Sequence, residues 1–206
     1  KWLSVFSKRL LGLLLALGSL LSVHPWAGVT AERTRVIIEA GQREASLALV
    51  NQNTYPVIVQ TWVDNGELDA EPDTAEAPFM PLPPVFRLNA GQQRSLRLLS
   101  TGQVLLTDRE SLYWLNLYEV PPQDKTALAD GQARLTVTLR TQMKIIYRPK
   151  ALKAHAEQAP RQLRFSLDGA RVQIENPTAY YITLAGANLR RDSIRAQLPG
   201  ATLAPF

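Results

Sequence analysis

The chain has 206 residues, a formal net charge of +5 and no cysteine. Without cysteine, no disulfide can support the fold and no thiolate can act as a nucleophile or metal ligand, so stability must come from buried apolar side chains. Lys1, Lys8 and Arg9 supply three of the 23 Lys and Arg residues, and all 18 Asp and Glu residues follow them, which leaves the rest of the chain at only +2. Its cations form no long basic block, which argues against a nucleic-acid-binding protein.

The first 27 residues have the pattern of an export signal. The three cations precede an apolar stretch, Leu10–Leu21, which is short for a membrane span. Two tripeptides end in a small residue and leave the cleavage position open, Pro25-Trp26-Ala27 and Val29-Thr30-Ala31. We expect residues 1–27 to be removed and the mature protein to have no membrane anchor; an uncleaved anchor is the alternative.

Strand-like segments then follow one another at short spacing. Turn signals such as Asp64-Asn65-Gly66 and Asn89-Ala90-Gly91 separate them. No segment after residue 27 shows a sustained helical period, so a parallel βαβ sheet is disfavoured and an antiparallel, immunoglobulin-like sandwich is favoured. The predicted strands are Thr34–Glu39, Glu44–Asn51, Val57–Asp64, Val85–Asn89, Arg94–Ser100, Leu112–Val120 and Ala133–Tyr147.

The last of these strands is unusually long. Ala133–Tyr147 alternates apolar and polar residues and would span about 50 Å, whereas ordinary strands have about five or six residues. Its residues Leu135, Val137 and Leu139 share one face. An apolar strand of this length at a sheet edge exposes unpaired backbone groups, so it must be covered or used to bind another chain.

Pro149 ends this strand, and the polar segment 150–160 is predicted to be a linker. Residues 28–149 then form the first immunoglobulin-like domain, and residues 161–206 begin a second one. These 46 residues are about half of what such a sandwich uses, so we expect the second domain to be incomplete. Its predicted strands are Gln162–Leu167, Arg171–Glu175 and Tyr180–Leu189.

Residues suited to catalysis are scarce. After residue 27 the only histidine is His155, in the predicted linker, where we expect it to be solvated. The chain has no GxxxxGK, GxGxxG or HExxH motif, and no spacing singles out a pair of catalytic carboxylates. We therefore expect no enzymatic activity, no metal and no cofactor. An exported hydrolase that uses carboxylates is the remaining enzymatic alternative.

Two cations lie among apolar residues of the predicted strands, Arg35 in the first and Lys144 near the end of the long one. An unpaired charge in an apolar setting is costly. If Arg35 and Lys144 meet across neighbouring strands, they form a receptor for one carboxylate, each charge-assisted hydrogen bond being worth about 1.5–3 kcal/mol. The alternative is that both side chains project into solvent.

Several motifs resemble the PapD-like family, the periplasmic chaperones of fimbrial assembly. The residues that follow the family signature through its sixth strand are Asp108-Arg109-Glu110-Ser111-Leu112, Trp114, Asn116-Leu117 and Val120-Pro121. Other matching segments are Arg33-Thr34-Arg35 (first strand), Pro83-Pro84-Val85 (proline turn), Thr141–Pro149 (end of the donor strand) and Asn176–Tyr181 (second domain). The resemblance runs from about Gly28 to the last residue, and Leu106 departs from it where proline or a smaller residue is usual.

The resemblance implies a boomerang of two immunoglobulin-like domains that receives pilus or fimbrial subunits in the periplasm and delivers them to an outer-membrane usher. Each subunit lacks the last strand of its own sandwich. The long strand of the chaperone would fill this gap, inserting Leu135, Val137 and Leu139 into the groove of the subunit. Arg35 and Lys144 match the pair that binds the subunit's C-terminal carboxylate.

The match raises two questions about geometry. Strict alternation puts Lys144 and Leu139 on opposite faces of the strand, so a twist, a bulge or a cleft open to both faces must intervene. Glu110 and Arg148 match two members of an ionic contact between the domains, but the expected acidic partner from the second domain is absent, since the chain ends at Phe206.

Beside a non-enzymatic chaperone and the exported hydrolase, one other class remains. In a generic immunoglobulin-like adhesion module, Leu135, Val137 and Leu139 would be the inner face of an ordinary strand. In a chaperone without a bound subunit, the same strand could be capped by a second copy, which would give a homo-oligomer. Neither nucleic acid nor, after removal of the signal, a membrane is an expected partner.

Overall fold

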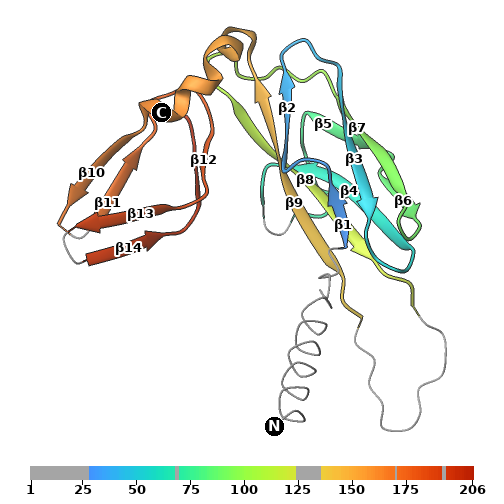
Figure 1. Ribbon diagram of the computed structural model, residues 1–206. Coiled ribbons are helices and arrows are strands. Elements are labelled where there is room, and N and C mark those ends of the chain that lie inside the picture. The colour runs from blue at the N-terminus through green and yellow to red at the C-terminus, as the bar shows by residue number, and fades with distance from the viewer. Residues whose placement is uncertain (1–27, 68–69, 124–135, 170, 192–193) are drawn as a thin grey trace, which may run out of the picture.

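The computed structural model describes residues 28–67, 70–123, 136–169, 171–191 and 194–206. The predicted export signal and Leu135 lie outside these residues. The described chain forms two β-rich domains that diverge from a short helical connector (Figure 1), which confirms the predicted all-β fold class. Within the described segments, no helix has the length and apolar character needed to cross a membrane.

The first domain is a sandwich of two sheets. The four-stranded sheet has the order β1 (Val29–Ala31), β3 (Glu44–Asn51), β7 (Gln93–Ser100), β5 (Phe79–Leu82). The five-stranded sheet has the order β2 (Arg35–Glu39), β9 (Leu139–Arg148), β8 (Ser111–Val120), β4 (Val57–Asp64), β6 (Val85–Leu88). All neighbours are antiparallel except β2 and β9, which run parallel. The sequence analysis missed β1 and β5, which are only three and four residues long.

The core lies between the two sheets, where alternate residues of each strand meet. In β9, Met143 and Ile145 point into this core, so Gln142 and Lys144 belong to the outer face of the five-stranded sheet. This alternation keeps charges out of the core of the sandwich. Its fully buried members include Leu47, Leu49, Leu96, Leu98, Leu115 and Ile145.

The long strand starts later than predicted. Residues 136–138 are not in a strand, and the ladder with β8 begins at the pair Leu139 and Glu119. The physical reason lies in the partner strand, because Pro121 and Pro122 follow β8 and have no amide hydrogen with which to continue the ladder. Val137 therefore lies outside the sheet, and Leu139 is the first residue of β9 in the ladder.

The predicted linker is a 3₁₀ helix, η1 (Lys150–Gln162), and it packs on the second domain. Buried Ala159 and half-buried Leu152 contact Tyr180 and Ile182, and the Tyr180 hydroxyl donates to the Leu152 carbonyl at 2.6 Å. On its other side, Lys153 forms an ion pair with Glu39 of β2 at 2.7 Å. The connector thus contacts both domains through a helical segment that was not predicted from the sequence; His155 within it is exposed as expected.

The second domain consists of short antiparallel pairs: β10 (Arg164–Asp168) with β11 (Arg171–Glu175), β12 (Ile182–Leu184) with β15 (Ala201–Leu203), and β13 (Ala187–Arg191) with β14 (Ile194–Leu198). The predicted strand Tyr180–Leu189 is wrong as a single element, since β12 ends at Leu184 and β13 begins at Ala187. The pair β12 and β15 runs beside the connector and faces the first domain (Figure 1), which places two of its side chains at the interdomain site described below.

Candidate functional site

The parallel pairing of β2 with β9 brings Arg35 and Lys144 side by side as register partners. Both side chains are half-buried on the outer face of the five-stranded sheet. Arg35 makes no hydrogen bond or ion pair with another described residue. The structure therefore places two positive charges next to each other without an acidic partner among the described residues, an arrangement suited to binding an anion.

Lys144 is fixed from three sides. Its Nζ donates hydrogen bonds to the hydroxyls of Thr183, at 3.1 Å, and Thr202, both in the second domain, and lies 5.6 Å from the centre of the Trp114 ring. Burial and the nearby Arg35 charge lower the pKa of Lys144 from its ordinary value, in that order of importance. We call Arg35, Lys144, Thr183 and Thr202 the interdomain site.

The edge of β9 beyond Arg35 has no partner strand. The ladder with β2 covers only Lys144–Arg148, so among the described strands Leu139–Met143 is paired on the β8 side alone. Val137 and Leu139 are 59% and 48% exposed, which differs from the buried inner face expected for an ordinary core strand. This combination of open backbone edge and exposed apolar side chains is suited to β-strand addition.

The register of β9 with β8 is continuous from Tyr147 to Leu139, without a bulge. Lys144 and Leu139 therefore do lie on opposite faces of the strand, as strict alternation requires. Of the three devices considered from the sequence, a bulge between these residues is excluded. Two explanations remain for how Lys144 and Leu139 could contact the same subunit: the twist of the strand, and access from both faces. Access from both faces is possible because Leu139 lies at the end of the ladder and not inside the sandwich.

A polar network that sequence reasoning missed lies beneath the start of β9. The Asp64 carboxylate, only 2% exposed, accepts from Trp62 Nε1 at 3.2 Å and Asn116 Nδ2 at 2.7 Å. Asn116 Oδ1 in turn accepts from Arg140 Nε at 2.9 Å and Gln142 Nε2 at 3.0 Å. The network ties the outer face of β9 to β8 and β4. Asp64 is the last residue of the predicted strand Val57–Asp64, but no role was predicted for its side chain.

A second cluster joins the two domains. Glu110, 2% exposed, accepts from Arg148 Nε at 2.7 Å with one oxygen and from the Tyr181 amide at 2.8 Å with the other. The Glu110 amide donates to the Ala179 carbonyl at 2.9 Å. The sequence-predicted pair Glu110 and Arg148 is thus in contact, and the second domain contributes backbone groups at a position where an acidic side chain had been expected.

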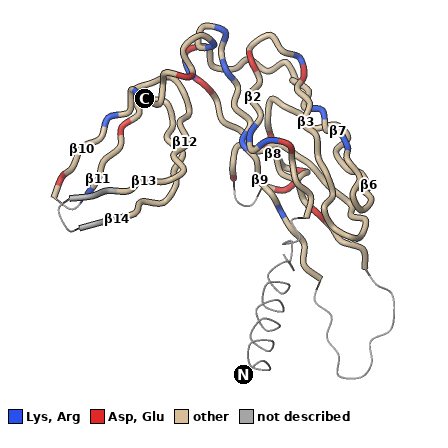
Figure 2. The backbone as a smooth tube through the Cα atoms, in the orientation of Figure 1, with Lys and Arg blue, Asp and Glu red and all other residues tan. Residues whose placement is uncertain are grey.

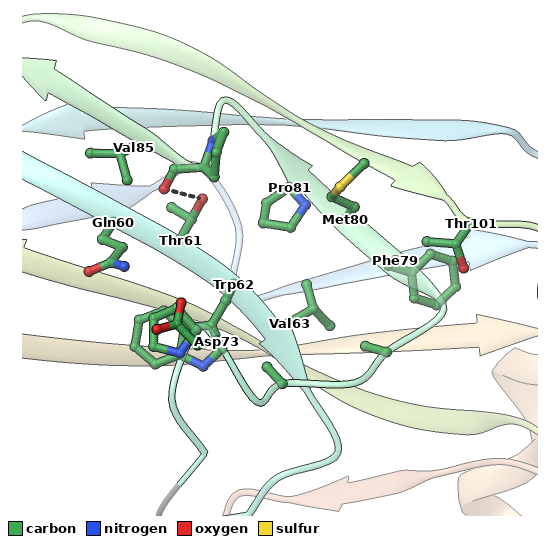
Figure 3. Close-up of a pocket in the computed structure, with 14 residues that line it drawn as sticks. Gln60, Thr61, Trp62, Val63, Asp73, Phe79, Met80, Pro81, Val85 and Thr101 are labelled. Atoms are coloured by element: carbon green, nitrogen blue, oxygen red, sulfur yellow. Dashed lines mark hydrogen bonds between the residues drawn. The ribbon is translucent and has the colours of Figure 1, made fainter.

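The proline turn lies at the opposite edge of the five-stranded sheet. Pro83, after a cis peptide bond, and Pro84 connect β5 to β6, and the Thr61 amide donates to the Pro84 carbonyl at 2.7 Å. Beside the turn is an open crevice of about 440 Å³, lined by β4 and β5 residues such as Trp62, Val63, Phe79 and Pro81 (Figure 3). Strand β8 lies between β4 and β9, and Lys144 does not line the crevice, so the crevice is not part of the interdomain site.

Lys and Arg residues are interspersed with Asp and Glu residues along the described chain (Figure 2), a pattern that does not favour a nucleic-acid surface. Within the described segments, no three His, Asp or Glu side chains are grouped so as to hold a metal ion. The interdomain site is therefore the candidate binding site with the clearest chemistry.

Comparison with known families decides the membership of this chain. Residues 28–153 match the model of the pili and flagellar-assembly chaperone, PapD N-terminal domain, and residues 158–206 match that of the pili assembly chaperone PapD, C-terminal domain. The chain belongs to the PapD-like family of pilus assembly chaperones. The resemblance stated from the sequence motifs is confirmed.

Individual relatives of this PapD-like chaperone cover both domains. It is 34% identical over 185 residues to the probable fimbrial chaperone YadV of Escherichia coli K12, covering 87% of this chain and 75% of YadV. It is 33% identical over 183 residues to the chaperone protein FimC of the same organism, with 87% and 72% covered.

Solved structures agree with this assignment. The CupB2 chaperone of Pseudomonas aeruginosa superimposes with a TM-score of 0.72 at 33% identity, covering 86% of this chain and 84% of CupB2. The SafB chaperone of Salmonella enterica, solved in complex with the SafA pilin, gives a TM-score of 0.67 at 33% identity, with 88% and 86% covered. The fold class and the chaperone family of this chain are thus established by sequence and by structure.

Proposed function

We propose that this PapD-like chaperone binds pilus subunits in the periplasm by donor-strand complementation. The open edge of β9 supplies the strand, the exposed Val137 and Leu139, together with Leu135, enter the groove of the subunit, and Arg35 with Lys144 binds its C-terminal carboxylate. The proposal rests on one observation. The unpaired edge of β9 begins next to Arg35 and Lys144, two neighbouring cations without an acidic partner among the described residues. A structural relative, SafB, was solved with a pilin bound, which supports the same class of client here.

The donor strand and the cation pair would contribute to subunit binding in different ways. Three aliphatic side chains buried in the groove contribute about 5–9 kcal/mol before losses, at about 1.5–3 kcal/mol each, so the strand supplies most of the affinity. The carboxylate sets the register, since a slip by one residue would turn the apolar set out of the groove. Arg35 and Lys144 are suited to this task because Lys144 is held in place from the second domain even without a subunit.

Several further features belong to the same proposal. Residues 1–27 are the export signal, residues 28–149 form the domain that binds the subunit, and segment 150–160 connects it to the domain that begins at residue 161. Glu110 and Arg148 hold the angle between the domains. The loaded chaperone delivers its subunit to an outer-membrane usher, acts without catalysis, and caps its own free strand in a homo-oligomer when no subunit is bound.

We expect Lys144→Ala to weaken subunit capture strongly, because the alanine removes one of the two charges that hold the carboxylate and leaves Arg35 alone. The loss is about 1.5–3 kcal/mol, or roughly 10- to 150-fold in affinity. The measurement is co-purification of a pilin-like subunit from periplasm that contains either form. Arg97→Ala, which removes an exposed ion pair with Glu44 on the other sheet, is the matched control. Equal recovery with Lys144→Ala and wild type would contradict the anchor.

The carboxylate anchor should weaken at alkaline pH. Only the charged form of Lys144 attracts a carboxylate, and burial beside Arg35 holds its pKa below the ordinary value of 10.5, so the affinity falls as the pH rises through this lowered pKa. Burial raises the pKa values of Tyr113 and Tyr181, so these two side chains become charged only at higher pH than ordinary tyrosines. Binding of a carboxylate-terminated strand peptide, followed by fluorescence anisotropy between pH 7 and 10.5, measures this. A profile as flat as that of Lys144→Arg, whose guanidinium stays charged, would contradict the prediction.

A further inference from the structure

The hydroxyls of Thr183 and Thr202 form a matched pair on the second domain. The two residues are register partners across β12 and β15, so both side chains lie on the same face of this short sheet. The neighbouring Ile182 is buried in the core of the second domain, which leaves Thr183 on the opposite, first-domain side. Both hydroxyl oxygens accept from Lys144 Nζ, and these are the contacts by which the second domain reaches the cation pair.

The side chains of this cluster have hydrogen-bond donors that their contacts with one another do not use. A lysine ammonium has three N–H groups, and two of them are used by Thr183 and Thr202, so one remains available. A threonine hydroxyl that accepts a hydrogen bond keeps its own O–H free to donate. The interdomain site therefore offers one ammonium N–H, two hydroxyl O–H groups and the Arg35 guanidinium to a single anion.

We propose that Thr183 and Thr202 are positioning residues of the carboxylate anchor, holding the Lys144 ammonium toward the space beside Arg35 and completing a receptor that is built from both domains. This inference rests on the proposed function, because it assigns second-domain residues to the same anchor. It implies that the affinity for a subunit carboxylate depends on the relative position of the two domains. A movement that separated β12 and β15 from β9 would release the Lys144 side chain and weaken the anchor without touching the donor strand.

The contact also has an effect that is independent of any subunit. Hydroxyl oxygens that accept from the ammonium stabilise its charged form, against the opposing effects of burial and of Arg35. The groups packed around Lys144 are Arg35 from β2, Trp114 from β8 and the two threonines, and of these only Arg35 is charged. Replacing both threonines by valine, which has nearly the same shape, should lower the midpoint of the Lys144 titration by about one pH unit.

The first experiment is a titration of Lys144 by NMR in the intact protein labelled with ¹³C at lysine Cε, with Lys144→Arg used to assign the signal. We expect the midpoint to fall in Thr183→Val/Thr202→Val and to stay at the wild-type value in Thr183→Ser/Thr202→Ser, which keeps both hydroxyls. Thr101→Val, a change at an exposed threonine near the β5 end of the first domain, is the control. A midpoint that is the same in the valine and serine variants would overturn the assignment.

The second experiment compares two synthetic peptides of alternating Val and Thr residues, one ending in a free carboxylate and one in an amide. The ratio of their affinities isolates the carboxylate from the strand. We expect the affinity ratio of carboxylate to amide peptide to fall about tenfold in Thr183→Val/Thr202→Val and to return to the wild-type value in the serine variant. The amide peptide should bind all variants equally. If wild type itself does not distinguish the peptides, the proposed anchor is wrong; if wild type and the valine variant distinguish them equally, the anchor stands and the role of the threonines is overturned.

Discussion

Glu110→Gln is expected to lower the free energy of unfolding by about 3 kcal/mol, the largest effect that we predict for a single isosteric change. The Glu110 side chain is only 2% exposed, and its two oxygens accept from Arg148 and from the Tyr181 amide. Glutamine keeps the shape but carries no charge, and its NH₂ group faces one of these two donors. Arg148, itself half-buried, is left without its compensating carboxylate, and such an unpaired charge is costly in a site with little water.

Urea unfolding followed by tryptophan fluorescence measures this loss. Asp108→Asn is a matched control in the same loop, because Asp108 is exposed and pairs only with its exposed neighbour Arg109, so its removal should leave the unfolding midpoint unchanged. Small-angle X-ray scattering adds a second readout, since the contact to Tyr181 links the two domains. A variant Glu110→Gln that unfolds at the wild-type urea concentration and keeps the wild-type scattering curve would show that the cluster does not hold the domains together.

Leu139→Asp is expected to prevent subunit capture while the chaperone itself remains folded. Because Leu139 is 48% exposed at the end of the β9 ladder, a carboxylate can be solvated there in the free protein. In the proposed complex the same carboxylate would be buried in an apolar groove. The loss of about 1.5–3 kcal/mol of apolar burial, added to the desolvation of a charge, should reduce the affinity by more than about 1000-fold.

Thr138→Asp is the control for this change. It places the same charge one residue upstream, where strict alternation turns the side chain away from the groove, and it should retain most of the capture. The measurement is pull-down of the subunit from periplasm together with a urea unfolding curve for each variant. Loss of capture in both variants alike would mean that general charge near the strand, and not the alternating face, is what matters, and the proposed register would have to be abandoned.

Part of the site could be predicted from the sequence because it depends on local patterns. Alternation over 139–147 predicts a strand whose faces differ, and the structure keeps that alternation without a bulge. The motif around Glu110 predicts the pair with Arg148, which is in contact. Local reasoning did not predict where the strand begins, because a neighbouring strand sets that limit. Residues 136–138 lie outside the strand, which begins at Leu139, since β8 ends before Pro121.

The helical turns of the segment 150–160 were not predicted, for a related reason. Its composition is polar and contains Pro160, which is typical of a linker, but tertiary contacts of Leu152, Ala156 and Ala159 with Tyr180 stabilise helical turns there. Packing of a few apolar residues outweighs a weak local preference. These contacts could not be deduced from the segment itself, because their partners lie in the second domain.

The sequence by itself determined the class of this protein. Its period-two alternation specifies strands with one apolar face, its turn residues separate them, and its motifs identify a PapD-like chaperone, all of which are properties of residues close together in the chain. Only the tertiary structure decided how the binding site is assembled. Strand order makes Arg35 a neighbour of Lys144, and the placement of the second domain brings Thr183 and Thr202 to the same ammonium. Such pairings depend on long-range backbone hydrogen bonds and shared burial, which leave no mark in the residues of any one segment.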